Sequence, residues 1–249
     1  MPQLTPYNVL LIGDSCTDEY VYGTCERLNP EAPVPILNFN RKETNKGMAW
    51  NVRENLMSFG IEVCILTNEE PITKTRYIDE RSNQHILRLD DEPILKPMDS
   101  ELPEYKFDAL VISDYDKGFL TTQKICELVS EFDGPVFLDS KKRVLPSQGC
   151  FIKINETEKK LLTGDYNNLI VTKGAGGADY DGVNYPAEKT KVYDVVGAGD
   201  TFLSALVYFH LFYGRIEEAI PYANKAASIA VQNFGTYVLT EEDVQDLRD

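Results

Sequence analysis

The sequence has few of the residues that build metal centres or disulfide scaffolds. Its two histidines, His85 and His210, lie far apart, and its five cysteines include no Cys-x-x-Cys pair. This excludes a zinc ribbon and argues against a disulfide framework, so we expect a protein of the cytoplasm. His210 lies in the apolar run SALVYFHLFYG, which favours a packed helix residue over a metal ligand.

Basic residues are also few. The chain has 25 Lys and Arg against 40 Asp and Glu, a net charge of −15. Such a chain repels phosphate backbones and anionic lipids, so neither nucleic acid nor a membrane is an expected partner. The opening MPQLTPYNVLLIGDS has no basic lead and too short an apolar run for a signal peptide. No segment approaches the roughly 20 apolar residues of a membrane span.

Short apolar runs recur along the chain, and most end in a polar residue. They are VLLIGD (9–14), VCILTN (63–68), ALVISD (109–114), PVFLDS (135–140), FIKIN (151–155) and LIVTKG (169–174). Such runs, with helical patterns between several of them, predict a doubly wound α/β fold with a mainly parallel sheet. Ligands of this fold lie beyond the carboxyl ends of the strands. Five polar residues fall there, each alone typical of a turn or helix cap and together favouring a site: Asp14, Asp114, Asp139, Asn155 and Thr172.

Two segments do not fit this sheet. Residues 18–40 and 71–93 alternate in polarity and contain turn formers, which predicts short antiparallel strands in a small sheet over one end of the site. Because no repeat, low-complexity tract or linker interrupts the chain, we expect residues 1–249 to form a single domain with this sheet as its appendage.

The stretch VYDVVGAGDTFLSAL (192–206) joins β-branched residues to an apolar, helix-like run. Gly197, Ala198 and Gly199 lack bulk, so a ligand oxygen can approach the free amides at the helix start. The carboxylate of Asp200 can accept a hydroxyl proton while those amides stabilise a transferred group, the combination that phosphoryl transfer needs. The alternative is a plain turn whose acid complements the helix dipole. The chain has no GxxxxGK[ST] motif and no H-R-D set, which excludes P-loop enzymes and protein kinases.

Several motifs carry a family resemblance. DVVGAGDTF resembles the carboxyl-terminal signature of the ribokinase-like (PfkB) carbohydrate kinases. VLLIGDSCTDEYVYGTCERLNPEAPVPIL, ITKTRYI, RSNQHILRLD and VISDYDKG are similar to the heptose-7-phosphate kinases, the kinase half of the lipopolysaccharide heptose enzymes, in the same order. The resemblance runs from about residue 9 to residue 240. It implies a ribokinase-like fold with a small β-sheet lid, and ATP-dependent transfer of the γ-phosphoryl group to a sugar hydroxyl, most like that of a heptose 7-phosphate, to form a heptose 1,7-bisphosphate.

On the nucleotide side, the resemblance makes Asp200 the catalytic base and places the transferring phosphoryl on the amides of residues 197–200. In NETE (155–158), Asn155 and Glu158 match a pair that organises Mg²⁺ and the nucleotide phosphates mainly through water, although the same spacing is a capping box. Lys153 either offers charge to a phosphate or is a solvated strand end. The helix and turn in residues 222–236 resemble those that flank adenine and ribose. The implied nucleotide contacts are Asn155, Glu156, Thr157, Glu158, Thr172, Gly174, Gly177 and Asn224.

On the sugar side, the resemblance assigns hydroxyl binding to two carboxylates and places two cations, Lys74 and Arg76, on the lid to receive a sugar phosphate. A solvated strand face is the alternative for both cations. The implied substrate contacts are Asp14, Asp18, Gly47, Asn51, Lys74, Arg76 and Asp114, with Lys117 beside them in the cleft. Asp194 matches a position that helps hold a monovalent cation in some relatives.

The chain departs from the family pattern in three places. In KGMAWNVR (46–53), Met48, Trp50 and Arg53 replace small residues. Their bulk is expected to reshape the sugar pocket, so the identity of the sugar stays open. The connections LTNEEPITK (66–74) and TGDYN are shorter than in relatives. A trimmed core of this kind is expected to expose apolar surface and to form a homodimer through the lid. The adenylyltransferase domain fused to some heptose kinases is absent from this sequence, so we expect the phosphorylation step alone.

Two alternatives stay open. The acceptor is another sugar, another sugar phosphate or a nucleoside, or the chain is a catalytically silent relative that binds nucleotide or sugar. The intact GAGD and NETE motifs speak against a silent relative, whereas KGMAWNVR and the missing segments favour it.

Overall fold

The computed structural model describes residues 6–233 and 235–248. Its main sheet has the strand order β12-β11-β10-β9-β8-β7-β1-β4. Six strands pair in parallel, namely β1 (Asn8–Gly13), β4 (Glu62–Thr67), β7 (Ala109–Asp114), β8 (Val136–Ser140), β9 (Phe151–Asn155) and β10 (Leu169–Thr172). Two short antiparallel strands, β11 (Ala178–Tyr180) and β12 (Val183–Tyr185), complete one edge. The predicted doubly wound, mainly parallel α/β fold is confirmed.

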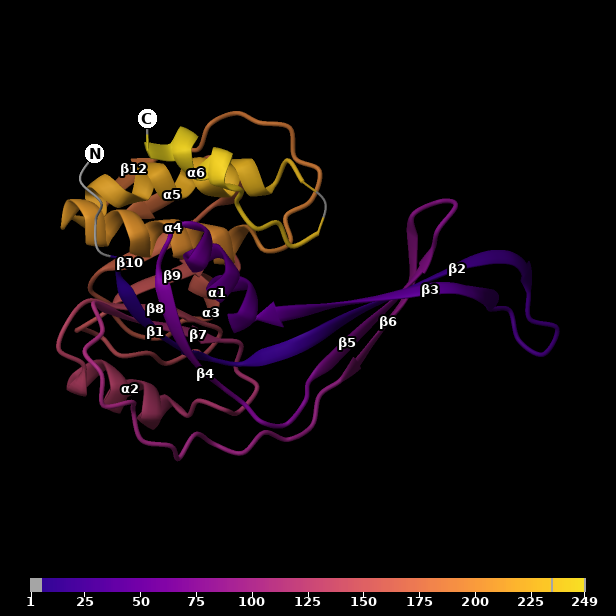
Figure 1. Cartoon of the computed structure of the whole chain (residues 1–249), viewed down its shortest axis with the longest axis horizontal. Coiled ribbons are helices and arrows are strands. Elements are labelled where there is room, and N and C mark those ends of the chain that lie inside the picture. The colour runs from indigo at the N-terminus through magenta and orange to yellow at the C-terminus, as the bar shows by residue number, and fades with distance from the viewer. Residues whose placement is uncertain (1–5, 234, 249) are drawn as a thin grey trace.

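Helices cover both faces of this sheet (Figure 1). One face packs against α1 (Ala49–Ser58), α4 (Ala198–Tyr213), α5 (Ile216–Ala230) and α6 (Glu241–Arg248). The other packs against α2 (Thr122–Glu131). Successive residues of a strand serve opposite cores, since Val9 and Leu11 join the first and Leu10 and Ile12 the second. None of the described helices combines the length and hydrophobicity that crossing a bilayer requires.

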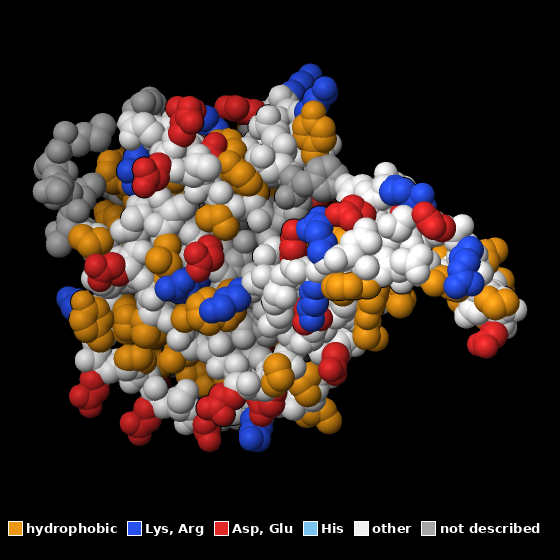
Figure 2. Space-filling model, turned by 45° about the vertical axis from the view of Figure 1, so that its right-hand side comes forward, with side chains coloured by type: hydrophobic (Ala, Val, Ile, Leu, Met, Phe, Trp, Pro, Cys, Tyr) orange, Lys and Arg blue, Asp and Glu red, His pale blue; other side chains and the backbone are white. Residues whose placement is uncertain are grey.

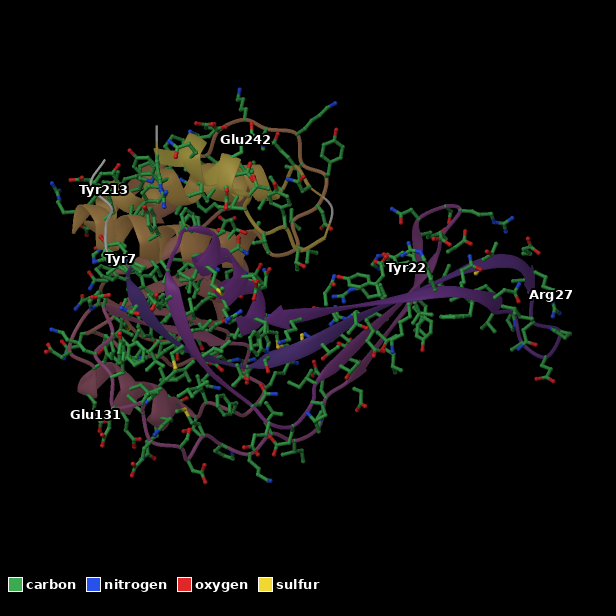
Figure 3. The ribbon with its side chains drawn as sticks, in the orientation of Figure 1. Tyr7, Tyr22, Arg27, Glu131, Tyr213 and Glu242 are labelled. Carbon is green, nitrogen blue, oxygen red and sulfur yellow. The ribbon has the colours of Figure 1, made fainter. Side chains whose placement is uncertain are left out.

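The second sheet projects from the body as an arm, which we call the lid (Figure 1). Its order is β3-β2-β5-β6, from β2 (Ser15–Leu28), β3 (Pro35–Met48), β5 (Thr73–Asp79) and β6 (Gln84–Asp91). Hydrophobic side chains gather along this arm (Figure 2). Tyr22 and Arg27 lie on it, far from the helical layer that carries Tyr213 and Glu242 (Figure 3).

The antiparallel pairing predicted within each lid segment is confirmed, because β2 pairs with β3 and β5 with β6 in this way, whereas the prediction of short strands is wrong for β2 and β3. β2 and β3 have 14 residues each, and β2 pairs with β5 in parallel. The parallel direction of β5 beside β2 follows from the main sheet. β2 comes after β1 and β5 after β4 in the chain, and β1 and β4 are themselves parallel neighbours. The boundaries of the predicted single domain stay a prediction. Residues 1–5 and 249 lie outside the described residues, and so does Phe234 in the turn expected within residues 222–236.

The turn between β10 and β11 depends on glycine. After the 3-10 turn η1 (Gly174–Gly176), Gly177 has φ 83° and ψ −131°, and a Cβ there would lie 2.0 Å from the carbonyl oxygen of Tyr185. Gly182, in the next turn, also has a positive φ of 75° but has no atom within 4 Å of a Cβ position. A comparison of the two glycines therefore separates the cost of a positive φ from the cost of a steric clash.

We expect Gly182→Ala to lower the free energy of unfolding by about 1 kcal/mol, through the left-handed backbone alone. Gly177→Ala adds a clash with a fixed carbonyl and is expected to cost at least about 2 kcal/mol more. Urea denaturation of both variants measures the difference. Equal losses would contradict the close approach of residue 177 to the β12 backbone.

Candidate active site

The start of helix α4 brings a carboxylate to the edge of the main sheet. Gly197 caps the helix with a left-handed φ of 78°, and a Cβ on it would lie 3.0 Å from the Nδ2 atom of Asn51. The amides of Ala198 and Asp200 donate to the carbonyls of Val195 and Gly197, at 3.3 and 3.0 Å. Glycine thus allows the turn to pack tightly against α1, with Asp200 in the first turn of the helix.

Both oxygens of the buried Asp200 carboxylate are held by neutral donors. Asn51 Nδ2 donates to Oδ2 over 2.7 Å, and the Tyr115 hydroxyl donates to Oδ1 over 3.1 Å. Burial raises the pKa of Asp200 to about 6, against the hydrogen bond from Asn51 and the charge of Lys153, which lower it, and with the charge of Asp139, which raises it. A carboxyl group with this pKa is ionised at neutral pH and is a stronger base than an exposed one.

Lys153, on β9, places a buried cation against the same helix turn. Its ammonium lies 2.6 Å from Asp139 Oδ2, on the neighbouring strand β8, and the residue is only 6% exposed. Burial lowers the pKa of Lys153, but the ion pair with Asp139 outweighs it and leaves the pKa raised. A Cβ on Gly199 would lie 2.9 Å from Nζ. The alternative of a solvated strand end is therefore wrong.

A small polar cavity of about 140 Å³ opens beside Asp200. It is lined by Asp114, Tyr115, Asp139, Lys141, Lys153, Glu158, Gly197, Gly199 and Asp200. Burial raises the pKa of Asp114 to about 6, against the hydrogen bond from Ser140 and the charge of Lys142. Two of the predicted strand-end residues, Asp114 and Asp139, therefore converge on Asp200 as expected.

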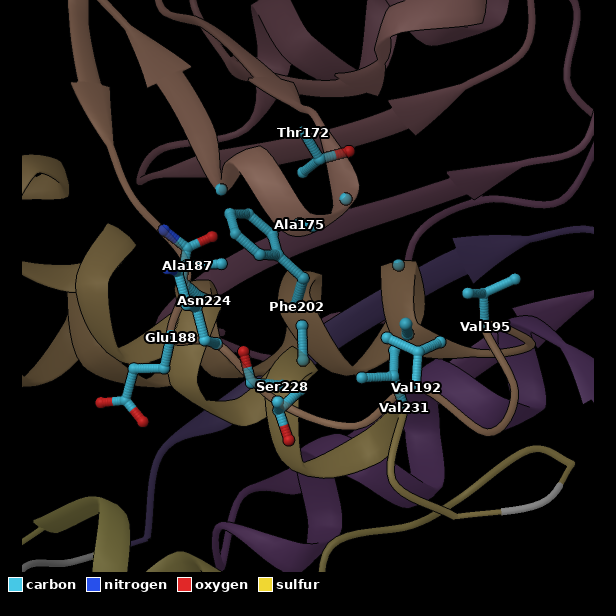
Figure 4. Close-up of a pocket in the computed structure, with 17 residues that line it drawn as sticks. Thr172, Ala175, Ala187, Glu188, Val192, Val195, Phe202, Asn224, Ser228 and Val231 are labelled. Atoms are coloured by element: carbon cyan, nitrogen blue, oxygen red, sulfur yellow. The ribbon is translucent and has the colours of Figure 1, made fainter.

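A larger, mainly apolar cavity of about 480 Å³ lies on the other side of the α4 start (Figure 4). Its walls include Phe202 of α4, Asn224 and Ser228 of α5, Thr172 at the end of β10, and two exposed valines, Val192 and Val195. Gly174 and Gly177 also line it, so four of the predicted nucleotide contacts face one cavity. Gly199 borders both cavities. A ligand in the larger one can therefore reach Asp200 across that glycine.

The NETE segment forms the cap of the short helix α3 (Glu156–Leu161). Asn155 Oδ1 accepts from the amides of Thr157 and Glu158, both at 2.9 Å, and Glu158 Oε2 accepts from the amide of Asn155 at 2.8 Å. The capping-box interpretation is confirmed. Only Glu158 of this segment lines the small cavity, whereas Asn155, Glu156 and Thr157 are exposed.

On the lid side, Asp18 forms an ion pair with Arg76 at 2.5 Å. A Cβ on Gly47 would lie 2.1 Å from Asp18 Oδ2 and 2.8 Å from Cys16 Sγ. Glycine at position 47 therefore makes room for the Asp18 carboxylate. The two residues predicted to bind sugar hydroxyl and sugar phosphate are paired with each other in the structure.

Asp14 holds the loop that follows β7 in place through hydrogen bonds. Its Oδ2 accepts from the amides of Tyr115 and Lys117, at 2.7 and 3.3 Å, while Oδ1 is buried without a partner among the described residues. Burial raises the pKa of Asp14. In this arrangement Asp14 fixes the loop that carries Tyr115, and its contact with sugar stays a prediction.

Two residues that line the small cavity, Tyr115 and Lys141, were not among the site residues predicted from the sequence. The Tyr115 ring lies 4.2 Å from Lys141 Nζ and 6.0 Å from Lys74 Nζ, and neither lysine forms an ion pair with any described residue. Burial lowers the pKa of Lys74. Tyr115 directly follows the strand end at Asp114, so the rule that selected Asp114 would have found it had aromatic residues been included.

Met48 has a backbone conformation that is normally found for glycine. It has φ 57° and ψ −126°, and its side chain is buried. Strain of this kind costs about 1–3 kcal/mol and clusters at functional sites. Trp50, which also departs from the family pattern, contacts two cations. Lys46 Nζ lies 3.8 Å and the Arg53 guanidinium 5.4 Å from the centre of its ring.

Comparison with known proteins finds relatives of two kinds. A sequence profile described as pfkB family carbohydrate kinase matches residues 149–243. The chain is 30% identical over 300 residues to the bifunctional protein HldE of a Nitratiruptor species, covering 96% of this chain and 64% of that protein. It is 31% identical over 312 residues to HldE of Vibrio parahaemolyticus, covering 98% and 65%. The chain thus spans somewhat less than two thirds of the length of these relatives.

Solved structures share the fold. Ribokinase from Thermotoga maritima has a TM-score of 0.73 at 15% identity, covering 97% of this chain and 99% of that one. Phosphofructokinase-2 from Escherichia coli in complex with potassium has a TM-score of 0.70 at 15% identity, covering 98% of both chains. Arabidopsis thaliana ribokinase complexed with ribose and ATP has a TM-score of 0.68 at 17% identity, covering 98% and 99%. At these identities the likeness concerns the fold alone.

The raised pKa of Asp200 makes a stability prediction. Below its ordinary pKa of 3.8 the carboxyl group is protonated in both folded and unfolded chains, so it does not lower the free energy of unfolding. As the pH rises from 3.8 through about 6, the unfolded chain loses this proton more readily and stability falls by up to about 3 kcal/mol. Asp200→Asn, which cannot ionise, is therefore expected to exceed the wild type in free energy of unfolding above pH 7 by up to that amount.

Urea denaturation from pH 4 to pH 8 measures this gain, which should shrink toward zero at the acid end. Asp133→Asn, at an exposed loop position, controls for the loss of one negative charge. A gain that is absent at pH 8, or that Asp133→Asn reproduces, would contradict a costly buried carboxylate at position 200.

Proposed function

We propose that the chain is a carbohydrate kinase of the pfkB family, whose profile matches residues 149–243, and that it transfers the γ-phosphoryl group of ATP to a sugar hydroxyl. One observation carries the proposal. The buried, doubly hydrogen-bonded Asp200 lies at the start of α4, where the small polar cavity and the large apolar cavity share Gly199 as a common wall. An adenine nucleotide in the larger cavity would present its phosphates to the smaller one.

The proposed reaction uses Asp200 as general base. The sugar hydroxyl gives its proton to the carboxylate as its oxygen bonds to the γ-phosphorus, and the bond from that phosphorus to the β–γ bridging oxygen breaks to release ADP. Asn51 and Tyr115 hold the two carboxylate oxygens and fix its direction. The amides of the first turn of α4 would exchange their local bonds for the phosphoryl oxygens.

Bound Mg²⁺ would neutralise phosphate charge in this site. Mg²⁺ usually binds through one or two carboxylates together with substrate phosphates and several waters. Glu158, which faces the small cavity, fits that role, and Asn155 would act through the cap that orients it. The described part of the chain contains no cluster of three His, Cys, Asp or Glu that could hold a metal alone. This supports an ion held mainly by phosphates and water.

A monovalent cation near Asp194 is a further part of the proposal. Asp194 Oδ1 and Oδ2 accept from the amides of Val196 and Gly235, at 3.1 and 3.0 Å, and so tie together the loops on either side of the α4 start. The potassium complex of phosphofructokinase-2, a protein of similar fold, supports the idea.

Heptose 7-phosphate is the acceptor we propose. The motifs that resemble heptose-7-phosphate kinases span the lid and the strand ends, and the bifunctional HldE proteins are similar along almost the whole chain. Lys74 and Lys141, both without an ion-pair partner among the residues described, offer charge for an acceptor phosphate. All five cysteines are free thiols, which supports the cytoplasmic location proposed from the sequence.

A coupled ADP-release assay over sugars, sugar phosphates and nucleosides tests this function. We expect the highest kcat/KM on a heptose 7-phosphate, a fall in rate below pH 6 as Asp200 takes up a proton, and at least about a 100-fold loss in Asp200→Asn. ATP binding without turnover of any acceptor would instead favour a silent nucleotide-binding module. Full turnover by Asp200→Asn would refute the assignment of the base.

We also propose a homodimer through the lid. In the lid register Tyr77 pairs with Leu87 and Thr75 with Leu89, so these side chains share one face, opposite the face of Lys74 and Arg76. Leu87 and Leu89 are 57% and 53% exposed. An apolar face on a projecting arm, turned away from the site, fits a second copy of the chain.

Sedimentation velocity tests the dimer. Leu87→Glu places a charge within this face and is expected to convert the dimer to a monomer without unfolding the chain. Ile94→Glu alters a residue that is 96% exposed outside the lid strands, and should leave the dimer intact. A monomeric wild type, or equal dissociation in both variants, would refute the interface.

A further inference from the structure

Lys153 is a cation in an unusual place. It interrupts the apolar strand FIKIN, yet its ammonium is buried and faces the small cavity beside Asp200. Buried ion pairs seldom add net stability, because the desolvation of two charges offsets their attraction. The Lys153–Asp139 pair therefore calls for a reason other than holding β8 and β9 together.

The position of Gly199 supplies that reason. Gly199 borders both cavities, and the Lys153 ammonium approaches it so closely that a Cβ there would lie 2.9 Å from Nζ. A terminal phosphate that enters from the large cavity must pass this glycine to reach Asp200. Lys153 is thus the buried cation next to its path, on the same wall as the base.

We propose that Lys153 is a catalytic residue whose ammonium contacts the transferring phosphoryl group, and that Asp139 positions it. This proposal rests on the proposed kinase function. A lysine ammonium acts as a compact point charge on phosphate oxygens. Charge aimed at the transferring group is the main aid that a protein gives to phosphoryl transfer.

The proposed step leaves Lys153 chemically unchanged. The sugar oxygen bonds to the γ-phosphorus, the bond to the β–γ bridging oxygen breaks with its electrons going to ADP, and the hydroxyl proton goes to Asp200. Lys153 keeps its own proton throughout and pairs with the equatorial oxygens of the phosphoryl group. Asp139, at 2.6 Å from Nζ, holds the ammonium at the cavity wall before the nucleotide arrives.

The affinity for ATP relative to ADP tests the contact without requiring turnover. Lys153→Met removes the charge and keeps an unbranched apolar side chain. We expect it to weaken ATP binding about tenfold and leave ADP binding unchanged, because only ATP carries the γ-phosphoryl group. Calorimetric titration measures both affinities. If the wild type turned over no sugar, this comparison would still decide the role of Lys153.

Turnover provides the second readout. The kcat of Lys153→Met is expected to fall about 100-fold with an unchanged KM for the sugar. Lys124→Met, on α2 at the opposite face of the sheet, controls for the loss of one positive charge. Unchanged ATP affinity together with kcat within threefold of the wild type, or equal weakening of ATP and ADP, would overturn the proposal.

A double variant protects the test from misfolding. Lys153→Met alone leaves the Asp139 carboxylate without its partner, which can destabilise the fold. Asp139→Asn combined with Lys153→Met removes both charges and is expected to fold while showing the same two losses. Asp139→Asn alone retains the ammonium and should keep the preference for ATP while lowering kcat. A double variant that folds and keeps the wild-type ATP preference would refute the contact.

Discussion

The arrangement of the site depends on one constraint, the burial of the Asp200 carboxylate at the start of α4. A buried carboxylate needs hydrogen bonds and nearby positive charge. These come from three distant segments: Asn51 on α1, Tyr115 after β7 and Lys153 on β9. Each segment must therefore meet the first turn of α4, and Gly197 and Gly199 make that approach possible. The small cavity lies against this turn, between Tyr115 and Lys153, and residues of β8 and α3 complete its lining.

In the proposed reaction, one cavity binds the nucleotide and the other holds the reacting groups. The larger one is apolar, with Phe202 and the exposed Val192 and Val195 in its walls, and suits the flat body of a nucleotide. The smaller one concentrates carboxylates and lysines at the place where charge would develop in the proposed reaction. Binding energy gained in the apolar cavity can thus be used to bring a phosphate into the polar one. Gly199, which lies between them, couples the two.

Sequence reasoning succeeds where structure is local. Runs such as VLLIGD and ALVISD identify parallel strands because burial on both faces leaves no alternation, and GAGD marks the helix start. It fails where partners are remote. Asn51 lies 149 positions before Asp200, and Tyr115 lies 85 positions before it, so no spacing reveals either hydrogen bond. The direction of β5 beside β2 depends on the order of β1 and β4, which strand periodicity does not encode.

We propose that the lid links acceptor recognition to the core through a charge pair. β2 follows β1 after a single residue and β5 follows β4 after residues 68–72, so the bases of the lid strands are fixed by the main sheet. Asp18 and Arg76, on neighbouring lid strands, neutralise each other in the structure. A free sugar would offer hydroxyls to Asp18 but nothing to the released guanidinium. An acceptor that carries both hydroxyls and a phosphate satisfies both partners when the pair opens, which favours a sugar phosphate over a free sugar on electrostatic grounds.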